Sequence, residues 1–253
     1  MGAHNGESGP RGLGARRPRL RSQLPSWGCR LTSDAMTEIL LHGFWRSSAA
    51  YRVRIALGLK GIAYRQQPVD LLAGEQHDAA YTQIAPHHLV PALEQDGRVL
   101  IESPAILEWI EAKWPTPPLL PDNIDDAAIV RAMAALIACD IHPLNNLRVL
   151  NAIRSDFEAT NPQVKAWIAR WITEGFAALE SLVARHGGRF AFGDTPTLAD
   201  CYLVPQLDSA ERYRVDLSPF PRVRAAGNAA RALAEVATAH PDLQPGAPAG
   251  PIA

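Results

Sequence analysis

The sequence has few cysteines, no long apolar run and no excess of charge of one sign. Its 253 residues contain Cys29, Cys139 and Cys201 without a C-x-x-C pair, so neither a disulfide framework nor a zinc knuckle is indicated, no metal is expected, and a reducing, cytoplasmic compartment is favoured. No apolar run approaches the roughly 18 residues of a bilayer span. A formal net charge of -1 favours neither nucleic acid nor a membrane as a partner. With 47% hydrophobic residues, the composition is that of an ordinary globular protein.

The first 36 residues differ in composition from the rest of the chain. Residues 1–36 contain six arginines and only two acidic residues, are rich in Gly, Pro and Ser, and show no periodicity. This composition predicts either a disordered leader or a translation start assigned too early, with translation beginning at Met36. It is also weakly typical of an organelle transit peptide. At the other end, residues 246–253 are expected to form a disordered tail.

Residues 37–114 alternate short apolar strands with helical patterns. Proline at the start of a strand, an Asp-Gly turn and a glycine after the first helix mark the boundaries. The expected elements are a strand at 39–42, a helix at 48–60, a strand at 64–70, a helix at 75–84, a hairpin of 91–94 and 99–101, and a helix at 103–113. The order βαβαββα predicts a thioredoxin-like domain.

The remainder of the chain is predicted to be helical. Residues 115–124 are rich in proline, which cannot continue a helix, and are expected to form a linker. The all-α domain should span 125–245, and Pro143 should bend or interrupt its first helix. Its expected helices are 125–151, 162–186, 197–212 and 221–237. The predicted fold class is therefore α+β, a thioredoxin-like domain followed by a helical bundle.

Two helix starts in the first domain carry groups suited to an anion. Ser47 and Ser48 precede or open the first helix, where unpaired backbone N–H groups are exposed, although a serine there is commonly no more than an N-cap. Glu102 and Ser103 stand before Pro104 at a second helix start. Between them, a cis bond before Pro91 would leave the backbone of Val90 free to pair with a peptide-like ligand.

Several other conspicuous residues are expected to be structural. Thr197 and Asp200 have the spacing of a capping box. Cys139 and Cys201 are expected to be small core residues, and Trp167 and Trp171 a packing stripe rather than a platform for a cofactor.

Five motifs over about residues 37–245 resemble the zeta class of glutathione transferases, which includes maleylacetoacetate isomerases and bacterial maleylpyruvate isomerases. The motif at 193–200 is general to glutathione transferases, whereas those at 46–57 and 140–148 point to the zeta class. The five motifs are Arg46-Ser-Ser-Ala-Ala-Tyr-Arg-Val-Arg-Ile-Ala-Leu57, Leu89-Val-Pro-Ala-Leu93, Glu102-Ser-Pro-Ala-Ile106, Asp140-Ile-His-Pro-Leu-Asn-Asn-Leu-Arg148 and Gly193-Asp-Thr-Pro-Thr-Leu-Ala-Asp200.

The resemblance implies a glutathione transferase fold with glutathione as cofactor. Ser47 would donate to the sulfur with Ser48 nearby, Val90 and Pro91 would lie along the tripeptide backbone, and Asn145 would face the cofactor. Glu102 and Ser103 would hold the γ-glutamyl end. The chain departs from the family at Ala49, where a cysteine is usual; the isomerase activity is expected to survive this change because the reacting thiol belongs to the cofactor.

The resemblance also implies a small dicarboxylate substrate and a homodimer. Arg46, Arg148 and Arg212 are the candidates to hold the two carboxylates, since a guanidinium grips a carboxylate with two donors. The alternative is that Arg148 and Arg212 are solvated helix-face charges. His142 would act as a donor beside the enolate, or else be a core histidine at a helix kink. The expected catalytic residues are thus Ser47, Ser48, Arg46 and His142.

The expected function is glutathione-dependent cis–trans isomerisation of a maleyl keto-acid in aromatic ring degradation. The motif at 140–148 favours maleylpyruvate over maleylacetoacetate. Two alternatives stay open. One is general glutathione transfer or dehalogenation of small α-halo acids, and the other is a non-catalytic scaffold with the same fold.

Overall fold

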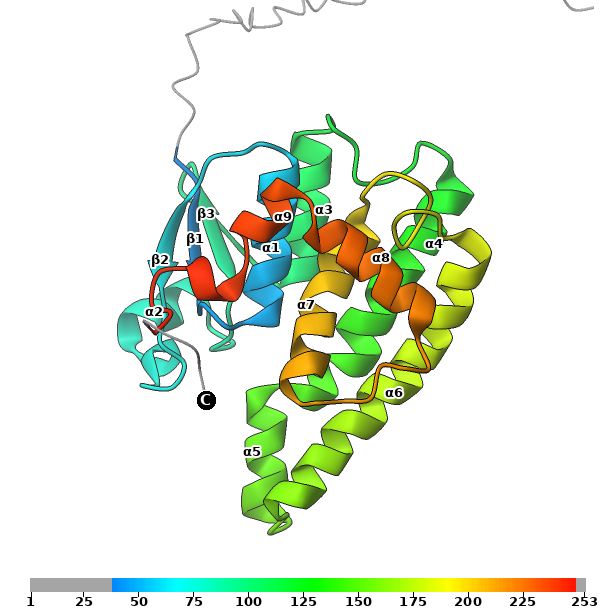
Figure 1. Cartoon of the computed structure of the whole chain (residues 1–253). Helices are drawn as coiled ribbons and strands as arrows, with labels where there is room; N and C mark the ends of the chain where they lie inside the picture. The colour runs from blue at the N-terminus through cyan, green and yellow to red at the C-terminus, as the bar shows by residue number, and fades with distance from the viewer. Residues whose placement is uncertain (1–37, 249–253) are drawn as a thin grey trace, which may run out of the picture. The chain divides into compact units, whose positions relative to one another are not determined.

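The computed structural model describes residues 38–248 (Figure 1). The expectations for residues 1–36 and for 249–253 lie outside this range. Of the segment expected to be a tail, 246–248 are described, and Ala247 packs against a small apolar cluster around Phe44 and Trp45.

The first half of the chain is built on a four-stranded sheet. Its strands are β1 (Leu40–Gly43), β2 (Arg65–Pro68), β3 (Ala92–Gln95) and β4 (Arg98–Ile101). They lie in the order β2-β1-β3-β4, with β1 parallel to β2 and antiparallel to β3, and β3 antiparallel to β4. This mixed sheet, with its helices, is the predicted thioredoxin-like arrangement.

Helices α1 (Ser48–Leu59) and α3 (Ser103–Lys113) lie between the sheet and the later helices (Figure 1). The expected helix at 75–84 is wrong in part. It divides into a 3-10 turn, Glu75–His77, and a short α2, Ala79–Ile84, because Asp78 is extended (φ -63°, ψ 144°) and becomes the N-cap of α2. The side chain of Glu75 accepts a hydrogen bond from the N–H of Asp70 at 2.6 Å.

The named elements of the second half, within its described length, are all helices or helical turns. Its expected first helix is interrupted around Pro143, as the proline indicated, and the expected helix at 221–237 is interrupted at Ala232 and Leu233. The elements are α4 (Ile124–Ala135), a π-helix (Leu136–Ile141), a 3-10 turn (Pro143–Asn145), α5 (Leu147–Asp156), α6 (Asn161–His186), α7 (Leu198–Arg212), α8 (Pro221–Arg231), α9 (Ala234–Thr238) and a 3-10 turn (Pro241–Leu243).

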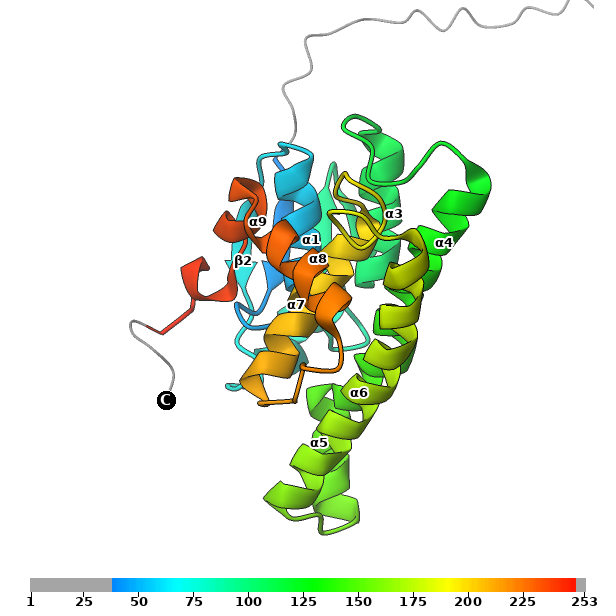
Figure 2. The same cartoon turned by 45° about the vertical axis from the view of Figure 1, so that its right-hand side comes forward.

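A single apolar core joins the two halves. Helix α7 packs against α1, α4 and α8, and Figures 1 and 2 both show it beside α1 and α8. Ile55 of α1, Leu107 of α3 and Leu203 of α7 are fully buried in the same cluster. Burial of apolar side chains from both halves holds their positions relative to one another, and with them the residues at the boundary.

The segment Ile124–Asp156 reaches the mean hydropathy of a membrane-spanning helix, 1.5 over its most apolar window, contrary to the sequence expectation. Its length and composition alone meet that criterion. The segment is not one regular helix, since the π-helix and Pro143 divide it, and one face packs inside the fold. In the single chain, only 33% of the most apolar stretch of this segment is buried.

The structural expectations hold with one exception. The Asp200 carboxylate accepts from the N–H and hydroxyl of Thr197 and from the N–H of Ala191, which is the expected cap. Cys201 is buried, but Cys139 is exposed. The reason is that Cys139 lies in the π-helix, whose wider turn does not continue the apolar stripe of α4.

Candidate active site

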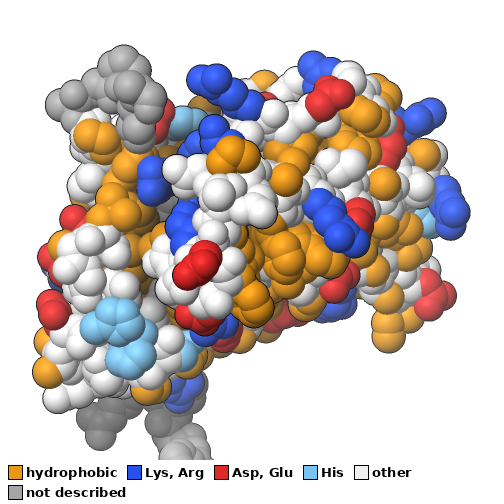
Figure 3. Space-filling view, turned by 90° about the horizontal axis from the view of Figure 1, so that it is seen from below, with side chains coloured by type: hydrophobic (Ala, Val, Ile, Leu, Met, Phe, Trp, Pro, Cys, Tyr) orange, Lys and Arg blue, Asp and Glu red, His pale blue; other side chains and the backbone are white. Residues whose placement is uncertain are grey.

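The site is a cavity of about 360 Å³ where the start of α1, the turn Glu75–His77, the start of α5 and the end of α7 meet. This volume is within the range usual for small-molecule sites. A smaller cavity of about 120 Å³ adjoins it at the start of α3, and His87, Val90 and His142 line both. We call them the main cavity and the side cavity. In Figure 3, which views this end of the molecule from below, histidine side chains gather on the surface of the sheet half.

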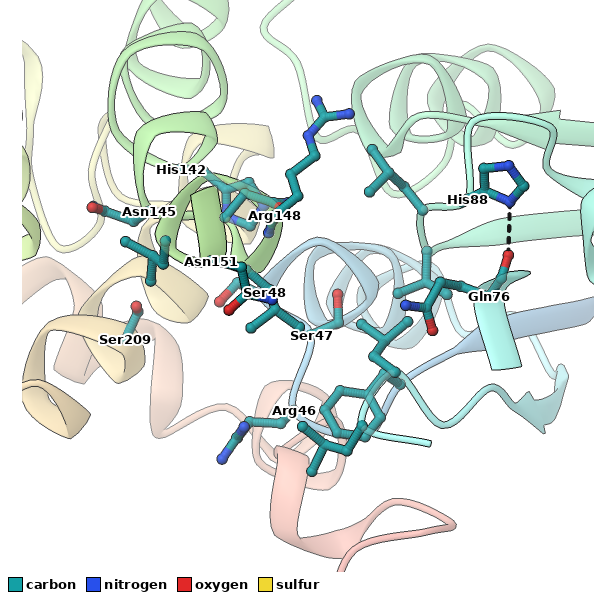
Figure 4. A pocket seen from close by; sticks show the side chains of 18 of the residues that line it. Arg46, Ser47, Ser48, Gln76, His88, His142, Asn145, Arg148, Asn151 and Ser209 are labelled. Atoms are coloured by element: carbon teal, nitrogen blue, oxygen red, sulfur yellow. Dashed lines mark hydrogen bonds between the residues drawn. The ribbon is translucent and has the colours of Figure 1, made fainter. Parts of the chain in front are cut away.

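Every site residue predicted from the sequence lines one of the two cavities. Those of the main cavity are Arg46, Ser47, Ser48, Val90, His142, Asn145, Arg148 and Arg212. Those of the side cavity are Val90, Pro91, Glu102, Ser103, His142 and Arg148, together with Ala49. Figure 4 shows Ser47 and Ser48 in the middle of the main cavity, with Arg46 and Arg148 on opposite sides of them.

Ser47 is both an N-cap and a free donor. Its backbone is extended (φ -67°, ψ 119°), and its Oγ accepts from the N–H of Ala50 at 3.2 Å. A hydroxyl has one proton to donate and two lone pairs to accept with, so capping α1 leaves the proton of Ser47 available to the cavity. The two sequence-based interpretations of this serine are therefore compatible. Ser48 is half-buried beside it as the first residue of α1.

The loop before β3 presents an unpaired backbone to both cavities. The Val90–Pro91 peptide bond is cis, as the sequence interpretation required. The Tyr81 hydroxyl donates to the carbonyl of Leu89 at 2.7 Å and holds the loop in place. Within residues 38–248, neither the N–H nor the C=O of Val90 has a hydrogen-bond partner. Both groups are thus free to pair with an extended peptide.

The start of α3 is uncapped. Glu102, not Ser103, is the N-cap residue; its φ is 67° and its side chain makes no capping hydrogen bond. A left-handed φ is unusual for a residue other than glycine and is concentrated at functional sites. The Oγ of Ser103 accepts from Nη1 of Arg52 at 3.2 Å. The first N–H groups of α3 remain available for an anion in the side cavity.

The break in the first long helix supplies the opposite wall of the main cavity. The N–H of His142 donates to the carbonyl of Ile137, five residues earlier, because Leu136–Ile141 is wound as a π-helix. Gly175 of α6 permits this, since a Cβ there would lie 2.3 Å from a side-chain carbon of Ile141. The side chain of Asn146 accepts from the N–H of Arg148 at 3.1 Å and caps α5.

Burial and two nearby positive charges act on His142. Desolvation and the charges of Arg52 and Arg212 lower the pKa of His142 to about 3. The imidazole is therefore neutral at physiological pH, and it can donate a hydrogen bond through one nitrogen only. This agrees with a role as donor and excludes one as a cation.

The three arginines of the main cavity differ in their partners. Arg148 is exposed, and its guanidinium makes no ion pair with any residue the structure describes. Arg46 lies over the ring of Trp45 at 5.6 Å, and burial and then the charge of Arg212 lower its pKa. Arg212 already pairs with Asp208, at 3.6 Å one turn earlier in α7. Among the residues the structure describes, Arg46 and Arg148 thus have no ion-pair partner, whereas Arg212 has one.

Most buried polar atoms that lack a partner line these cavities. Within the described part of the chain, two such atoms lie elsewhere, Arg54 Nη1 and Trp171 Nε1. The others are Arg52 Nε and Nη2, Gln76 Oε1, His87 Nδ1 and both amide atoms of Asn145. Buried polar groups are nearly always satisfied in proteins, so this concentration marks a place where a ligand completes the hydrogen bonding.

Sequence reasoning missed several lining residues. Arg52 carried a signal, because an arginine falls among the apolar positions of the predicted helix at 48–60. Gln76, His87 and Asn151 carried none, since their places depend on how separate segments meet. Among residues 38–248, no group of His, Cys, Asp and Glu is arranged to hold a metal ion.

The donor and acceptor pattern suits a small acidic peptide. A serine donor at a helix start, a free backbone pair at Val90 and an uncapped helix start line the two adjoining cavities. Two family models match the chain, the N-terminal domain of glutathione S-transferase over residues 41–118 and its C-terminal domain over 165–226. A maleylpyruvate isomerase of Ralstonia sp is 49% identical over 207 residues, 81% of this chain and 98% of that protein. The chain belongs to the glutathione transferase family.

Solved structures place this transferase in the zeta class. A holo structure of maleyl pyruvate isomerase, described as a bacterial glutathione-S-transferase in the zeta class, is 48% identical with a TM-score of 0.81, covering 83% of this chain and all of that one. A maleylacetoacetate isomerase from Anaeromyxobacter dehalogenans, with glutathione bound, is 46% identical with a TM-score of 0.76, covering 84% and 99%. The predicted fold and family are confirmed.

Proposed function

We propose that this transferase is a glutathione-dependent cis–trans isomerase that converts a maleyl keto-acid to its fumaryl isomer in aromatic ring degradation. The observation that carries the proposal is one cavity holding a free serine hydroxyl at a helix start together with two unpaired arginines. The names of the similar proteins, maleylpyruvate and maleylacetoacetate isomerase, support it. The few cysteines also support a cytoplasmic location.

The chain offers partners for each part of glutathione. Ser47 and Ser48 face the sulfur, the backbone of Val90 pairs with the cysteinyl residue, and Ser103 lies at the γ-glutamyl end. The unpaired amide of Asn145 contributes a donor and an acceptor. When bound, glutathione supplies a thiolate that adds reversibly to the cis double bond, which permits rotation about the carbon–carbon bond.

The start of α1 makes that thiolate available at neutral pH. A free thiol has a pKa near 8.5, so only a few per cent is ionised at pH 7. The Ser47 hydroxyl donates to the sulfur, and the positive end of the α1 dipole lies beside it. Both stabilise the ionised form and lower the pKa of the thiol.

Side chains from both halves hold the substrate, Arg46 from the loop before α1 and the others from the helical half. The unpaired guanidinium groups of Arg46 and Arg148 each bind a carboxylate. Arg212, partly neutralised by Asp208, adds positive field more than a direct grip. Neutral His142 donates to the substrate oxygen on which negative charge develops.

A substrate panel tests the function. Purified protein at catalytic concentration is given glutathione with maleylpyruvate, maleylacetoacetate or a small α-halo acid, and loss of each substrate is followed. We expect rapid isomerisation of at least one maleyl keto-acid. Turnover of halo-acids alone would instead identify a general transferase or dehalogenase. No turnover of any substrate, with Ser47→Ala binding glutathione as the unmodified protein does, would leave a non-catalytic scaffold.

We further propose that the protein is a homodimer, with a second copy covering the outer face of α4. That face presents Ala128, Ala132 and Ala135 at helical spacing, and Ile124 at its start is 81% exposed. It belongs to the apolar segment of which only 33% is buried in the single chain. Light scattering should give twice the chain mass, and Ala132→Arg should give the mass of one chain.

A further inference from the structure

Arg52 is a buried cation without an anionic partner. Its side chain in α1 is 2% exposed, and no carboxylate among residues 38–248 pairs with it. Nη1 donates to Ser103 Oγ at 3.2 Å, and the guanidinium lies over the ring of Tyr202 at 4.7 Å. Nε and Nη2 are buried with no partner at all. Because an unpaired buried charge is costly, a fold that retains one has a use for it.

Arg54, two residues later in the same helix, provides the internal comparison. It is 1% exposed, but its Nε donates to the carbonyl of Ala239 at 3.0 Å and its Nη2 to the carbonyl of Trp45 at 3.1 Å. It lines neither cavity. Arg54 thus fastens the C-terminal segment to α1, and its role is structural. The Nε and Nη2 donors of Arg52 make no such hydrogen bonds to backbone carbonyls.

Arg52, whose Nε and Nη2 are unused, lines the side cavity. Arg52, Glu102 and Ser103 all line that cavity, which lies at the uncapped start of α3, an eleven-residue helix. The helix start and the buried guanidinium are independent sources of positive potential at one place. Burial lowers the pKa of Arg52 to about 10, so the group is still charged at neutral pH. The cavity is therefore arranged for a carboxylate.

The same cavity also holds a negative group. The Glu102 side chain is exposed at its mouth, 3.7 Å from His87. A positive and a negative side chain in one small cavity match a ligand end that carries both a carboxylate and an ammonium group. The γ-glutamyl end of glutathione has both on one carbon, whereas the glycyl end has only a carboxylate. The chemistry therefore favours the γ-glutamyl end.

We propose that Arg52 is a positioning residue for glutathione, which sets the affinity for the α-carboxylate of the γ-glutamyl group. It holds the Ser103 hydroxyl in place through Nη1 and supplies a desolvated positive charge behind it. The inference rests on the proposed use of glutathione. Because Ser103 is proposed to lie between Arg52 and the ligand, replacement of Arg52 weakens binding of the tripeptide, although Arg52 itself is assigned no contact with the sulfur or the substrate.

The ligand-free protein should tolerate loss of this charge. Methionine has nearly the reach of arginine and no charge, so Arg52→Met removes an uncompensated buried cation and fills similar space. We expect little change in the melting temperature. Arg54→Met leaves two backbone carbonyls without their donors and should lower the melting temperature clearly. This contrast separates a ligand-directed arginine from a structural one.

The decisive experiment is a cycle of protein and ligand variants measured by titration calorimetry, with no turnover involved. The ligands are glutathione, its glycyl ethyl ester, and γ-aminobutyryl-cysteinyl-glycine, which lacks only the α-carboxylate. For the unmodified protein, loss of that carboxylate should weaken binding on the order of 10- to 100-fold. For Arg52→Met, removal of the α-carboxylate from the ligand should weaken binding less than about threefold. The ester should weaken binding equally in both proteins, and Arg54→Met should show the full carboxylate penalty.

The outcomes are distinct from those for the proposed function. An equal carboxylate penalty in the unmodified protein and in Arg52→Met overturns the inference about Arg52 and leaves the function intact. Failure of the unmodified protein to bind glutathione overturns the proposed function itself. If Arg52→Met does not fold, Arg52→Lys takes its place; it keeps the charge but loses the guanidinium fork, so its carboxylate penalty should be intermediate. An unchanged penalty in that variant also overturns the inference.

Discussion

The two walls of the main cavity present their groups by different means. On the sheet side, Ser47 is held by its capping bond to α1, and Val90 offers backbone atoms. On the helical side, His142, Asn145 and Arg148 project from a helix that is broken by a π-helix and a proline. The first wall is set mainly by backbone geometry. The second is set by side chains, which substitution can change without altering the backbone.

This difference fits a division of labour. A backbone-defined wall suits a ligand that never varies, such as a common cofactor, whereas a wall of side chains suits a substrate that differs between related enzymes. With the exceptions of Arg46, assigned to the diacid, and Asn145, assigned to the cofactor, substitutions on the sheet side should then affect the cofactor and its thiol, and those on the helical side the diacid. The following four experiments test this separation, from the largest expected effect to the smallest.

Ser47→Ala should have the largest effect. Loss of the hydroxyl that caps α1 and that we propose as the donor to the sulfur should lower kcat/KM about 100-fold and raise the pKa of the bound thiol, measured by the ultraviolet absorbance of the thiolate. Ser47→Gly is the control, because glycine costs little at an N-cap. Equal activity loss in both variants assigns the effect to the hydroxyl. If activity instead follows the melting temperature, Ser47 acts only through α1.

Arg148→Ala should affect binding of the substrate rather than of glutathione. We expect KM for the maleyl keto-acid to rise about tenfold, since a hydrogen-bonded charge pair is lost, while the affinity for glutathione changes less than twofold. Arg154 is the matched control on the same helix, since its Nη1 bonds the carbonyl of Leu150 and it does not line the cavity. Arg154→Ala should leave both constants unchanged. Equal losses for the two ligands in Arg148→Ala would contradict the division between the walls.

His142, the half-buried histidine of the helical wall, should make stability depend on pH. The folded pKa of His142 is about 3 against an ordinary 6.5, so between these values the unfolded chain binds more protons than the folded one. Stability therefore rises with pH and is lost as pH falls from about 6.5 toward 3. Urea unfolding of His142→Asn should give a flatter profile in this interval. Parallel profiles would show that the imidazole is not kept neutral by its surroundings.

Ala49→Cys should have the smallest effect. Ala49 is half-buried and lines the side cavity, not the main cavity that Ser47 lines. Restoring the cysteine usual in the family should change kcat/KM by less than about threefold, in the range of substitutions that make no specific contact. Progress curves with and without a thiol-blocking reagent measure it. A large gain would mean that a protein thiol at this position joins the reaction.

The sequence alone predicted elements whose signals are local. The helix at 103–113 has the expected bounds, and the turn at Asp96 and Gly97 has the two left-handed residues (φ 54° and 73°) that an Asp-Gly hairpin requires. Asp200 was identified as a cap from its spacing to Thr197. In each case the deciding interactions join residues within four positions of one another.

Prediction was incomplete where hydrophobic periodicity does not reveal a local change of helix type or cap, and where separate segments meet. The break at Asp78 and the exposure of Cys139 follow from a capping switch and a π-helix that periodicity does not reveal. The sequence could not distinguish Asn146, which caps α5, from Asn145, whose amide is buried and unpaired. It also gave no reason to separate Arg52 from Arg54.

By itself, the sequence determined the order of the main elements, the family, and part of the lining of the site, because caps, turns and motifs depend on neighbouring residues. Only the tertiary structure decided which of those residues have unused hydrogen bonds and charge. That Arg52 has unused donors depends on what lies across from it where α1 packs against α3 and α7, and that is set when distant helices bury their apolar faces together.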